Sequence, residues 1–271
     1  MNAPGKVTVV IPVWDDYVSY LSDAVESVRR NSPDAPIVIV DNASRTEVPE
    51  LEGCTIVSTE RRLSAGAARN VGLQHVDTEL VLFLDADDML LDGTLGFMRS
   101  RIDADPAMSI SATAILDGET GERHRSPRRF VARLAQRPRL FAVADSVWSL
   151  LPLQGCAVMR TSQVRESGGY ADANLGEDWV LAVALAFQGR VDLSDRLGRL
   201  YRPTPGSLLR SAGRTPREFA ESAGRVRERL RSDPGVPRWA RALLPLIALF
   251  QLGAIYVARP AYLGVRSLIR R

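Results

Sequence analysis

The chain has 271 residues, of which 45% are hydrophobic and 25% charged, enough apolar surface for a sizeable globular core. Its formal net charge is +3, but the part from Arg196 onward has 16 arginines and only four acidic residues, so the preceding part is acidic. Cys54 and Cys156 exclude a disulfide framework, and MNAPGKVTVVIP does not follow a signal-peptide pattern, so we expect a cytoplasmic protein.

Strands alternate with helices along the first part of the chain. Apolar, β-branched runs predict strands within residues 6–12, 35–44, 55–58, 80–85 and 109–115. Apolar residues at helical spacing predict helices over residues 17–31 and 64–76. This alternation is typical of βαβ units, so we predict an α/β fold with a mostly parallel sheet flanked by helices.

The pattern changes after the fifth predicted strand. Residues 117–145 are polar, basic and rich in helix breakers at their start, and we expect a mobile insertion over the sheet edge. Residues 153–170 resume an ordered pattern, and residues 174–189 predict a helix with a glycine stop. Beyond Tyr201 the chain is rich in arginine and poor in predicted strands.

Polar side chains follow three of the predicted strands. Asp15 and Asp16 come after the first strand, Asp41 after the second and Asp85 after the fourth. The carboxyl ends of parallel strands meet at one edge of a sheet, and ligands bind at that edge. The sequence therefore predicts a binding site there.

The fourth strand leads into a D-x-D-D cluster formed by Asp85, Ala86, Asp87 and Asp88. Repulsion between neighbouring carboxylates raises their pKa values unless a cation neutralises them. Mg²⁺ and Mn²⁺ prefer such oxygen ligands, and Mg²⁺ is often shared with substrate phosphates. We predict a Mg²⁺ or Mn²⁺ site; the alternative is a solvated acidic turn.

Five stretches resemble family 2 glycosyltransferases and occur in the order that this family has: VTVVIPVWDD, IVIVDNAS, AGAARNVGL, LVLFLDADD and LGEDWVLAVALAFQG. The resemblance covers roughly residues 6–210. It implies a GT-A fold, which is a Rossmann-like α/β fold, and inverting sugar transfer from a nucleotide-diphosphate donor. We expect a glycosyltransferase domain at 1–210 and a basic, helical C-terminal extension at 211–271.

The resemblance also implies roles for single residues. It places the nucleotide-sugar against Pro12, Val13, Asp15, Asp41, Asn42, Gly66, Arg69, Asp85, Ala86 and Asp87. Asp87 would bind the metal between the two phosphates, Asp85 would contact ribose or metal-bound water, and Asp88 is a weaker metal ligand. For Arg69, a helix-surface ion pair is an equal alternative.

Asn42 stands where the family more often has Asp. Its amide can still accept the N3–H of uracil or thymine and donate to a carbonyl. A UDP- or dTDP-sugar is therefore favoured, and GDP stays open. Thr204 likewise stands where the family often has a metal-binding His, so the metal would have one protein ligand fewer.

Glu177 and Asp178 match the acidic pair that the family has near its acceptor. We expect Asp178 to act as the general base on the acceptor hydroxyl. The alternative is an acid-rich helix start that is favoured by the helix dipole. Trp179 either stacks on a sugar ring or belongs to the core.

Residues 243–258 carry no charge, and arginines precede and follow them. The run is shorter than the ~20 residues that span a bilayer. A buried helix, a partner-binding helix and a membrane-surface helix all fit, and we favour the last, with arginines on lipid head groups and exposed Trp239, Tyr256 and Tyr262. This would place the protein at the inner face of the cell membrane. No nucleic-acid module is recognised, and we expect no nucleic-acid binding.

These features together predict an inverting, metal-assisted glycosyltransferase that acts on a glycan or lipid-linked acceptor. Two alternatives are kept. A nucleotidyltransferase also uses acids on a parallel sheet, but PVWDDYVS lacks the usual glycine- and lysine-rich phosphate loop. A non-catalytic sugar-nucleotide-binding subunit is the other.

Overall fold

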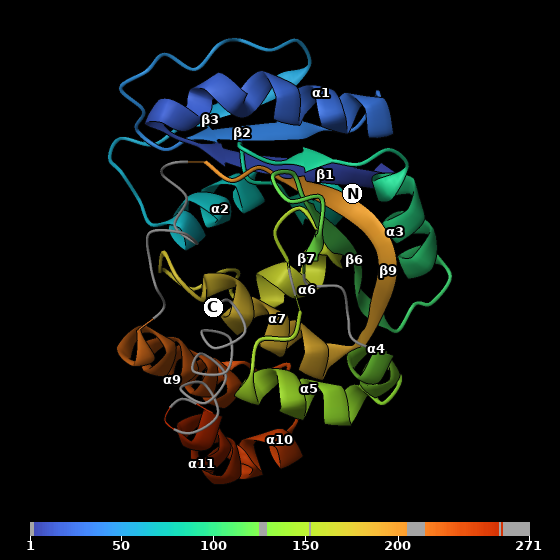
Figure 1. Cartoon of the computed structure of the whole chain (residues 1–271), viewed down its shortest axis with the longest axis vertical. Coiled ribbons are helices and arrows are strands. Elements are labelled where there is room, and N and C mark those ends of the chain that lie inside the picture. Colours follow the sequence, from blue (N-terminus) through green and yellow to red (C-terminus); the bar gives the residue numbers. More distant parts are fainter. Residues whose placement is uncertain (1–2, 125–128, 152, 205–214, 255, 257–271) are drawn as a thin grey trace.

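The computed structural model describes residues 3–124, 129–151, 153–204, 215–254 and 256. Within these ranges the chain forms one sheet with helices on both faces, and the last helices form an outer layer (Figure 1). The N-terminal helix α1 covers one face of the sheet. Helices α2 and α7 lie on the opposite side, and α9 to α11 lie beyond them.

The sheet of the described residues has nine strands in the order β3-β2-β1-β4-β8-β6-β9-β5, with β7 paired to β6. The strands are β1 (Ala3–Val13), β2 (Ile37–Asp41), β3 (Cys54–Ser58), β4 (Thr78–Phe83), β5 (Met89–Leu90), β6 (Met108–Asp117), β7 (Arg123–His124), β8 (Ala157–Arg160) and β9 (Arg190–Tyr201). All five predicted strands are present.

The first half of the sheet is parallel, as predicted. β1 pairs in parallel with both β2 and β4, and β2 pairs in parallel with β3. The second half is mixed: β8 is antiparallel to β4 and β6, whereas β9 is parallel to β6 and antiparallel to β5. The parallel half therefore brings the predicted polar strand ends to one edge.

The helices are α1 (Leu21–Asn31), α2 (Ala65–Gln74), α3 (Thr94–Asp103), α4 (Arg129–Ala135), α5 (Pro138–Val147), α6 (Thr161–Glu166), α7 (Glu177–Gln188), α9 (Pro216–Ser232), α10 (Arg238–Ala242) and α11 (Leu244–Gly253), with a 3₁₀ turn over Asp15–Tyr20. The three predicted helices correspond to α1, α2 and α7. Ser64 begins α2, as its position suggested, because its hydroxyl accepts the N–H of Ala67.

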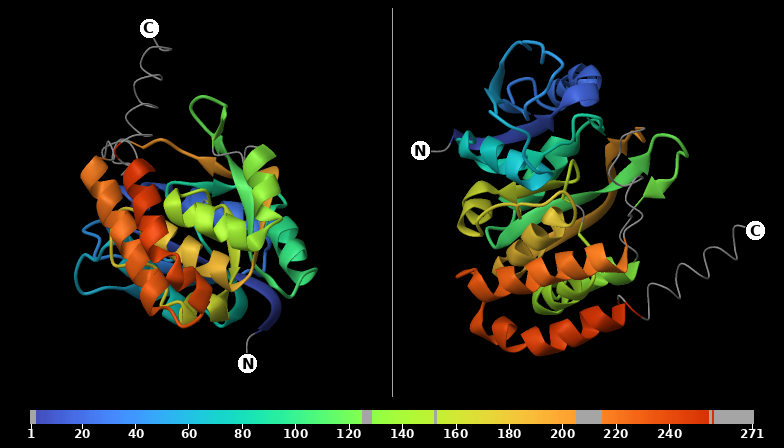
Figure 2. Two further views of the ribbon diagram at one scale, coloured as in Figure 1. Left: turned by 90° about the horizontal axis from the view of Figure 1, so that it is seen from below. Right: turned by 90° about the vertical axis from the view of Figure 1, so that its left-hand side faces the viewer.

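The core consists of a layer on each face of the sheet and a third layer outside. Alternate residues of β1 face opposite sides, so Val9 and Ile11 pack towards α1 and α3 whereas Val10 packs towards α2 and α7. The third layer lies between α7 and α9, where Val183 packs near Val226. Figure 2 shows α9 and α11 running side by side over the outer face of the molecule.

The expectation of a mobile insertion at 117–145 was wrong for most of that segment. It contains α4 and α5, and α5 buries Phe141 and Ala142 in the core against α7. Pro138 does not break this helix, because it occupies the first turn, where its missing N–H costs nothing. Residues 125–128 lie outside the described residues.

The expected division at residue 210 also lies outside the described residues. On either side of it, Trp179 of α7 and Phe219 of α9 belong to one apolar cluster, so the extension packs directly on the preceding part. Trp239 was expected to be exposed, but it is half-buried against Phe187. None of the helices described here is both long and apolar enough to cross a bilayer.

Candidate functional site

The ends of β1 and β2 hold Asp15 and Asp41 close together. Val13 pairs with Asp41 in the sheet, and the Ser44 hydroxyl accepts the N–H of Asp15 while the Ser44 N–H donates to Asp41 Oδ1 at 2.9 Å. Asp15 adopts a left-handed φ of 43° at this turn. Pro12 and Val13 are buried in the strand just before it.

Asp15 is the anionic part of a small surface cluster. Its Oδ1 accepts the N–H of Arg45 at 3.0 Å, and its Oδ2 pairs with Arg62 at 3.2 Å. The hydrogen bond from Arg45 and the charge of Arg62 lower the pKa of Asp15. The Arg62 guanidinium also lies over the Trp14 ring, 4.5 Å from its centroid. The cluster lies at the expected place of the nucleoside.

Asn42 does not have the contacts expected of a base-reading residue. Its side chain is buried, its Nδ2 donates to the carbonyl of Leu63 at 3.0 Å, and its Oδ1 accepts the N–H of Leu63 at 2.8 Å. The two hydrogen bonds of the Asn42 amide therefore hold the loop before α2 in place. The prediction that it reads uracil or thymine does not fit these contacts.

The acids of the D-x-D-D cluster have arginine partners. Asp85 Oδ1 pairs with Arg69 at 2.7 Å, and Asp85 Oδ2 lies 3.6 Å from Arg199. Burial alone would raise the pKa of Asp85, but the two arginines outweigh it and the pKa lies below its ordinary value. Asp88 is fully buried, pairs with Arg199 and accepts the N–H of Arg202.

Asp87 differs from its neighbours because no direct ion pair with an arginine is found for it among the described residues, although the charge of Arg199 acts on it. Its Oδ2 accepts a hydrogen bond from the Thr204 hydroxyl at 2.9 Å. Burial, and then the charge of Asp85, raise the pKa of Asp87, and Thr204 only partly offsets this. Nearby, Arg202 donates to the Asp87 carbonyl and pairs with Asp23.

Arg69 joins the D-x-D-D cluster to the start of α7. Its Nη1 pairs with Glu177 Oε1 at 2.9 Å while its Nη2 holds Asp85, and its side chain is buried. It is therefore neither a surface ion pair nor an exposed phosphate ligand. Burial and the adjacent Asp178 raise the pKa of Glu177 to about 7, although Arg69 opposes this.

Gly66 allows α2 to approach the loop before α7. A Cβ at Gly66 would lie 1.9 Å from the carbonyl oxygen of Ala171, which no side chain allows. One turn later, Asn70 exchanges two hydrogen bonds with the backbone of Tyr170. These residues fix Arg69 between the two acidic groups.

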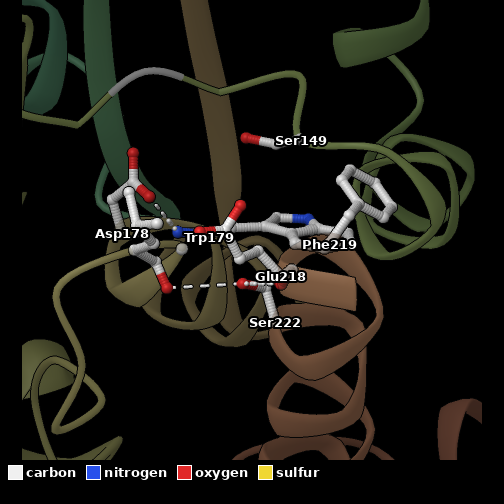
Figure 3. A pocket seen from close by; sticks show the side chains of 8 residues that line it. Ser149, Asp178, Trp179, Glu218, Phe219 and Ser222 are labelled. Carbon is white, nitrogen blue, oxygen red and sulfur yellow. Dashed lines mark hydrogen bonds between the residues drawn. The ribbon is translucent and has the colours of Figure 1, made fainter. Parts of the chain in front are cut away.

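Asp178 lies at the first turn of α7 and borders a pocket of about 340 Å³, part of it open to solvent (Figure 3). Its Oδ1 accepts the N–H of Trp179 at 2.8 Å. The opposite wall comes from α9. The pocket is lined by Ser149, Leu175, Gly176, Asp178, Trp179, Glu218, Phe219 and Ser222.

Trp179 belongs to the core, which decides between its two interpretations. Its side chain is only 2% exposed, its Nε1–H donates to the carbonyl of Asp145 at 2.5 Å, and its ring packs 5.1 Å from that of Phe219. A ring face held in this way is not free to stack on a sugar. Only its edge reaches the pocket.

A family model, Glycosyl transferase family 2, matches residues 8–165, more than half of the chain. The chain belongs to glycosyl transferase family 2. Membership in this family favours the glycosyltransferase prediction over the nucleotidyltransferase and non-catalytic alternatives.

Solved structures of TarS from S. aureus have the same fold as this glycosyltransferase. The complex of TarS 1–349 with UDP-GlcNAc has a TM-score of 0.68 at 18% identity, and the match covers 93% of this chain and 73% of that one. The complex with UDP has a TM-score of 0.64 at 16% identity, covering 92% and 71%. At this identity the likeness supports the GT-A fold alone.

A relative from Rickettsia felis is described as an uncharacterized glycosyltransferase. It is 30% identical over 93 residues, which is 31% of this chain and 15% of that protein. The match therefore spans a small part of the relative's length.

No group of three or more His, Cys, Asp or Glu side chains in the described part of this glycosyltransferase is arranged to hold a metal ion. A single carboxylate, Asp87, is nevertheless available to a hard cation. Asp87 is a buried carboxylate whose pKa is raised by burial and by Asp85, and a cation would relieve both effects. Asp88 is already committed to Arg199.

The sequence did not reveal Arg199 or the α9 side of the pocket. Arg199 is one of many arginines in the second half of the chain, and its acidic partners are far away in sequence. Glu218 and Phe219 lie beyond the stretch that resembles the family. A weak signal existed for Arg199, because a single charge between Leu197 and Leu200 is unusual unless it is paired.

Proposed function

We propose that this glycosyltransferase moves a sugar from a nucleoside-diphosphate donor to an acceptor hydroxyl with inversion of the anomeric carbon. The observation that carries this proposal is Arg69, whose guanidinium contacts both Asp85 and Glu177. Residues 85–88, which we call the donor loop, and the first turn of α7, which holds Asp178, are therefore adjacent. A single displacement needs a donor group and a base at such neighbouring positions.

The donor would lie along the ends of β1, β2 and β4, with Asp15 and Asp41 near the nucleoside. The likeness to TarS, which binds UDP-GlcNAc and UDP in its solved complexes, favours a UDP-sugar over a dTDP-sugar. Asn42 does not contribute to that preference, since its amide holds Leu63. Gly66 and Arg69 act behind the donor by shaping the loop.

Asp87 would hold Mg²⁺ or Mn²⁺, next to Asp85, which stays paired with Arg69 and close to Arg199. A bound cation would screen these carboxylates and stabilise the charge that develops on the leaving diphosphate. The Thr204 hydroxyl, which donates to one oxygen of Asp87, keeps that carboxylate oriented. Asp88 and Glu177 have structural roles, because each is buried against an arginine.

Asp178 would take the proton of the acceptor hydroxyl as its oxygen bonds to the anomeric carbon. The bond from that carbon to the diphosphate breaks in the same step, and the nucleoside diphosphate leaves. The pocket beside Asp178 supports an acceptor with several hydroxyls, since Ser149, Glu218 and Ser222 line it. We propose a glycan or a lipid-linked glycan.

A lipid-linked acceptor would place the protein at a membrane, and α11 supports this. Its outward face carries Leu246, Leu249 and Phe250, which are all exposed, although no bilayer-spanning helix is found in the described residues. Large exposed apolar patches commonly mark interaction sites. The arginines around this helix would attract anionic head groups.

The decisive experiment uses Asp178→Asn and Asp87→Asn. With Mn²⁺ and a panel of nucleotide sugars and acceptors, the wild type should release nucleoside diphosphate. Asp178→Asn should bind the donor like the wild type and lose at least about 100-fold in kcat, the usual size of a general-base effect. Asp87→Asn should lose the Mn²⁺-dependent part of donor binding, which calorimetry measures.

Two results would contradict the proposal. Turnover by Asp178→Asn at the wild-type rate would place the base elsewhere. Donor binding by the wild type that does not respond to Mn²⁺ or Mg²⁺, with Asp87→Asn unchanged, would remove the metal from the mechanism while leaving the transferase assignment intact.

A further inference from the structure

Arg199 is a buried arginine of β9 that the proposed reaction does not use. It is 6% exposed, too little for direct contact with a substrate. Its guanidinium pairs with Asp88, lies 3.6 Å from Asp85 Oδ2 and donates from Nη1 to the carbonyl of Gln154 at 2.6 Å. It thus connects two acids of the donor loop to the segment before β8.

The backbone is shaped to admit this side chain. Gly155 has a φ of +60°, and a Cβ there would lie 2.8 Å from Arg199 Cδ and 3.0 Å from Leu84 Cδ1. Glycine both accepts this conformation and leaves space for the arginine stem. The position of Arg199 is therefore specified by two segments of the chain.

The contacts of Arg199 close a ring with those of Arg69. Asp85 is shared, with Oδ1 on Arg69 and Oδ2 near Arg199, and Gln154 completes the circuit because its Nε2 donates to Glu177 at 3.4 Å. We call this set the charge ring; its members are Asp88, Arg199, Asp85, Arg69, Glu177 and Gln154. It spans the donor loop, α2, α7, β9 and the segment before β8.

We infer that Arg199 is a positioning residue that holds the donor loop, through Asp85 and Asp88, in the conformation that binds the nucleoside diphosphate. This rests on the proposed donor site. Arg69 of α2 holds only Oδ1 of Asp85, so without Arg199 the other Asp85 oxygen loses its arginine and the buried Asp88 keeps only the N–H of Arg202. Asp87, between them in sequence, then loses its fixed position.

The test must separate this role from simple neutralisation of Asp88. Arg199→Met combined with Asp88→Asn removes both charges, so no buried ion is left without a partner. Arg199→Lys keeps the charge but replaces the planar fork with a single ammonium, which cannot serve two carboxylates and a carbonyl in the same geometry. Arg196→Met, an exposed site on the same strand, is the control.

Thermal unfolding shows which variants fold, and calorimetry with UDP and Mn²⁺ gives Kd. For folded variants we expect Kd to rise about tenfold in the double variant, or about 1.4 kcal/mol, and also to rise in Arg199→Lys. The donor KM should rise more than kcat falls, whereas Arg196→Met should match the wild type. A purely structural loss would lower the folded fraction and leave KM unchanged.

Wild-type Kd and KM in either folded Arg199 variant would overturn the inference. It would also fail if kcat alone fell. If the wild-type protein bound no nucleoside diphosphate at all, the proposed function would fail instead, so the two failures are distinguishable.

Discussion

Asp145 is a buried carboxyl group whose protonation should affect the stability of this protein. It is fully buried on α5, and its Oδ1 accepts the N–H groups of Leu150 and Leu151. Its Oδ2 has no hydrogen-bond partner among the described residues. Burial raises the pKa of Asp145 to about 7, and the two N–H donors only partly oppose this.

The raised pKa of Asp145 predicts a pH-dependent stability. The folded state binds the proton more tightly than the unfolded state, whose pKa is ordinary at 3.8. The stabilisation of the folded state by this tighter proton binding is therefore fully present below about pH 4 and is lost as pH rises towards about 7. Asp145→Asn removes this titration, so the variant should gain stability relative to the wild type across that range.

Urea unfolding of both proteins between pH 4 and pH 8 would measure this difference. Other buried acids such as Glu177 are present in both proteins, so their titration cancels. Asp34→Asn, at an exposed site, is the control. A stability difference between Asp145→Asn and the wild type that does not change with pH would show that the carboxyl stays in one protonation state.

At the residue scale the sequence predicted the acids but not their partners. The D-x-D-D cluster and the Glu177-Asp178 pair are recognisable because each is contiguous. Arg199 pairs with Asp88 from the far end of the domain, and nothing local distinguishes it from other arginines. Asn42 was assigned to the base because it matches a base-reading position of the family, whereas its amide is buried against Leu63.

At the element scale, α2 packs so closely against the loop before α7 that Gly66 has no room for a side chain. Gly66→Ala places a methyl group 1.9 Å from the Ala171 carbonyl oxygen, so the loop before α7 has to move. We expect a loss of about 3 kcal/mol or more in the free energy of unfolding. Donor binding should weaken with it, since Arg69 follows on the same helix.

Gly96→Ala is the matched control for this substitution. Gly96 lies inside α3 and is exposed, and a Cβ added there would have no atom outside its own helix turn within 4 Å. There the same chemical change should stabilise the protein by about 0.5–1 kcal/mol through helix propensity. Urea unfolding gives both values, and an equal effect of the two variants would rule out the steric explanation.

The sequence predicted those elements whose own residues form an apolar pattern. β1, β2 and β4 are continuous apolar runs, and α1 and α7 have helical spacing. β9 was missed because charged residues interrupt it, and these are paired with Asp85, Asp88 and Arg101 from distant segments. Tertiary contacts decided its structure, which local patterns do not contain.

At the scale of the whole molecule, the outer surface formed by α11 is apolar where a protein surface is usually polar. The buried residues of α11 are Ile247 and Gln251, and Gln251 donates to the carbonyl of Ser146 at 2.7 Å. The outward face exposes Leu249 by 63% and Phe250 by 61%. Exposing these apolar side chains to water costs free energy, whereas burying them in the surface of a lipid bilayer is favourable.

We therefore predict that the protein binds vesicles containing anionic lipid more strongly than neutral vesicles. Leu249→Ser with Phe250→Ser should reduce vesicle binding at least about tenfold, because two exposed side chains worth about 1.5–3 kcal/mol each on burial are lost. Stability should change little, since both are already in water. Phe130→Ser on α4, also at an exposed site, should bind like the wild type.

Co-sedimentation at low and high salt would check this prediction. Binding that is equal for anionic and neutral vesicles would contradict a role for the arginines. Binding that survives the α11 double substitution would place the contact elsewhere on the molecule.

The link between Asp87 and Thr204 crosses 117 residues of sequence, and that between Arg202 and Asp23 crosses 179. A nascent chain on the ribosome that has exposed only its first half therefore carries the aspartates without the strand that holds them. Proteins dominated by such remote contacts fold slowly. The proposed donor site is therefore complete only after β9 and the residues that follow it have emerged, long after the first strands of the sheet were made.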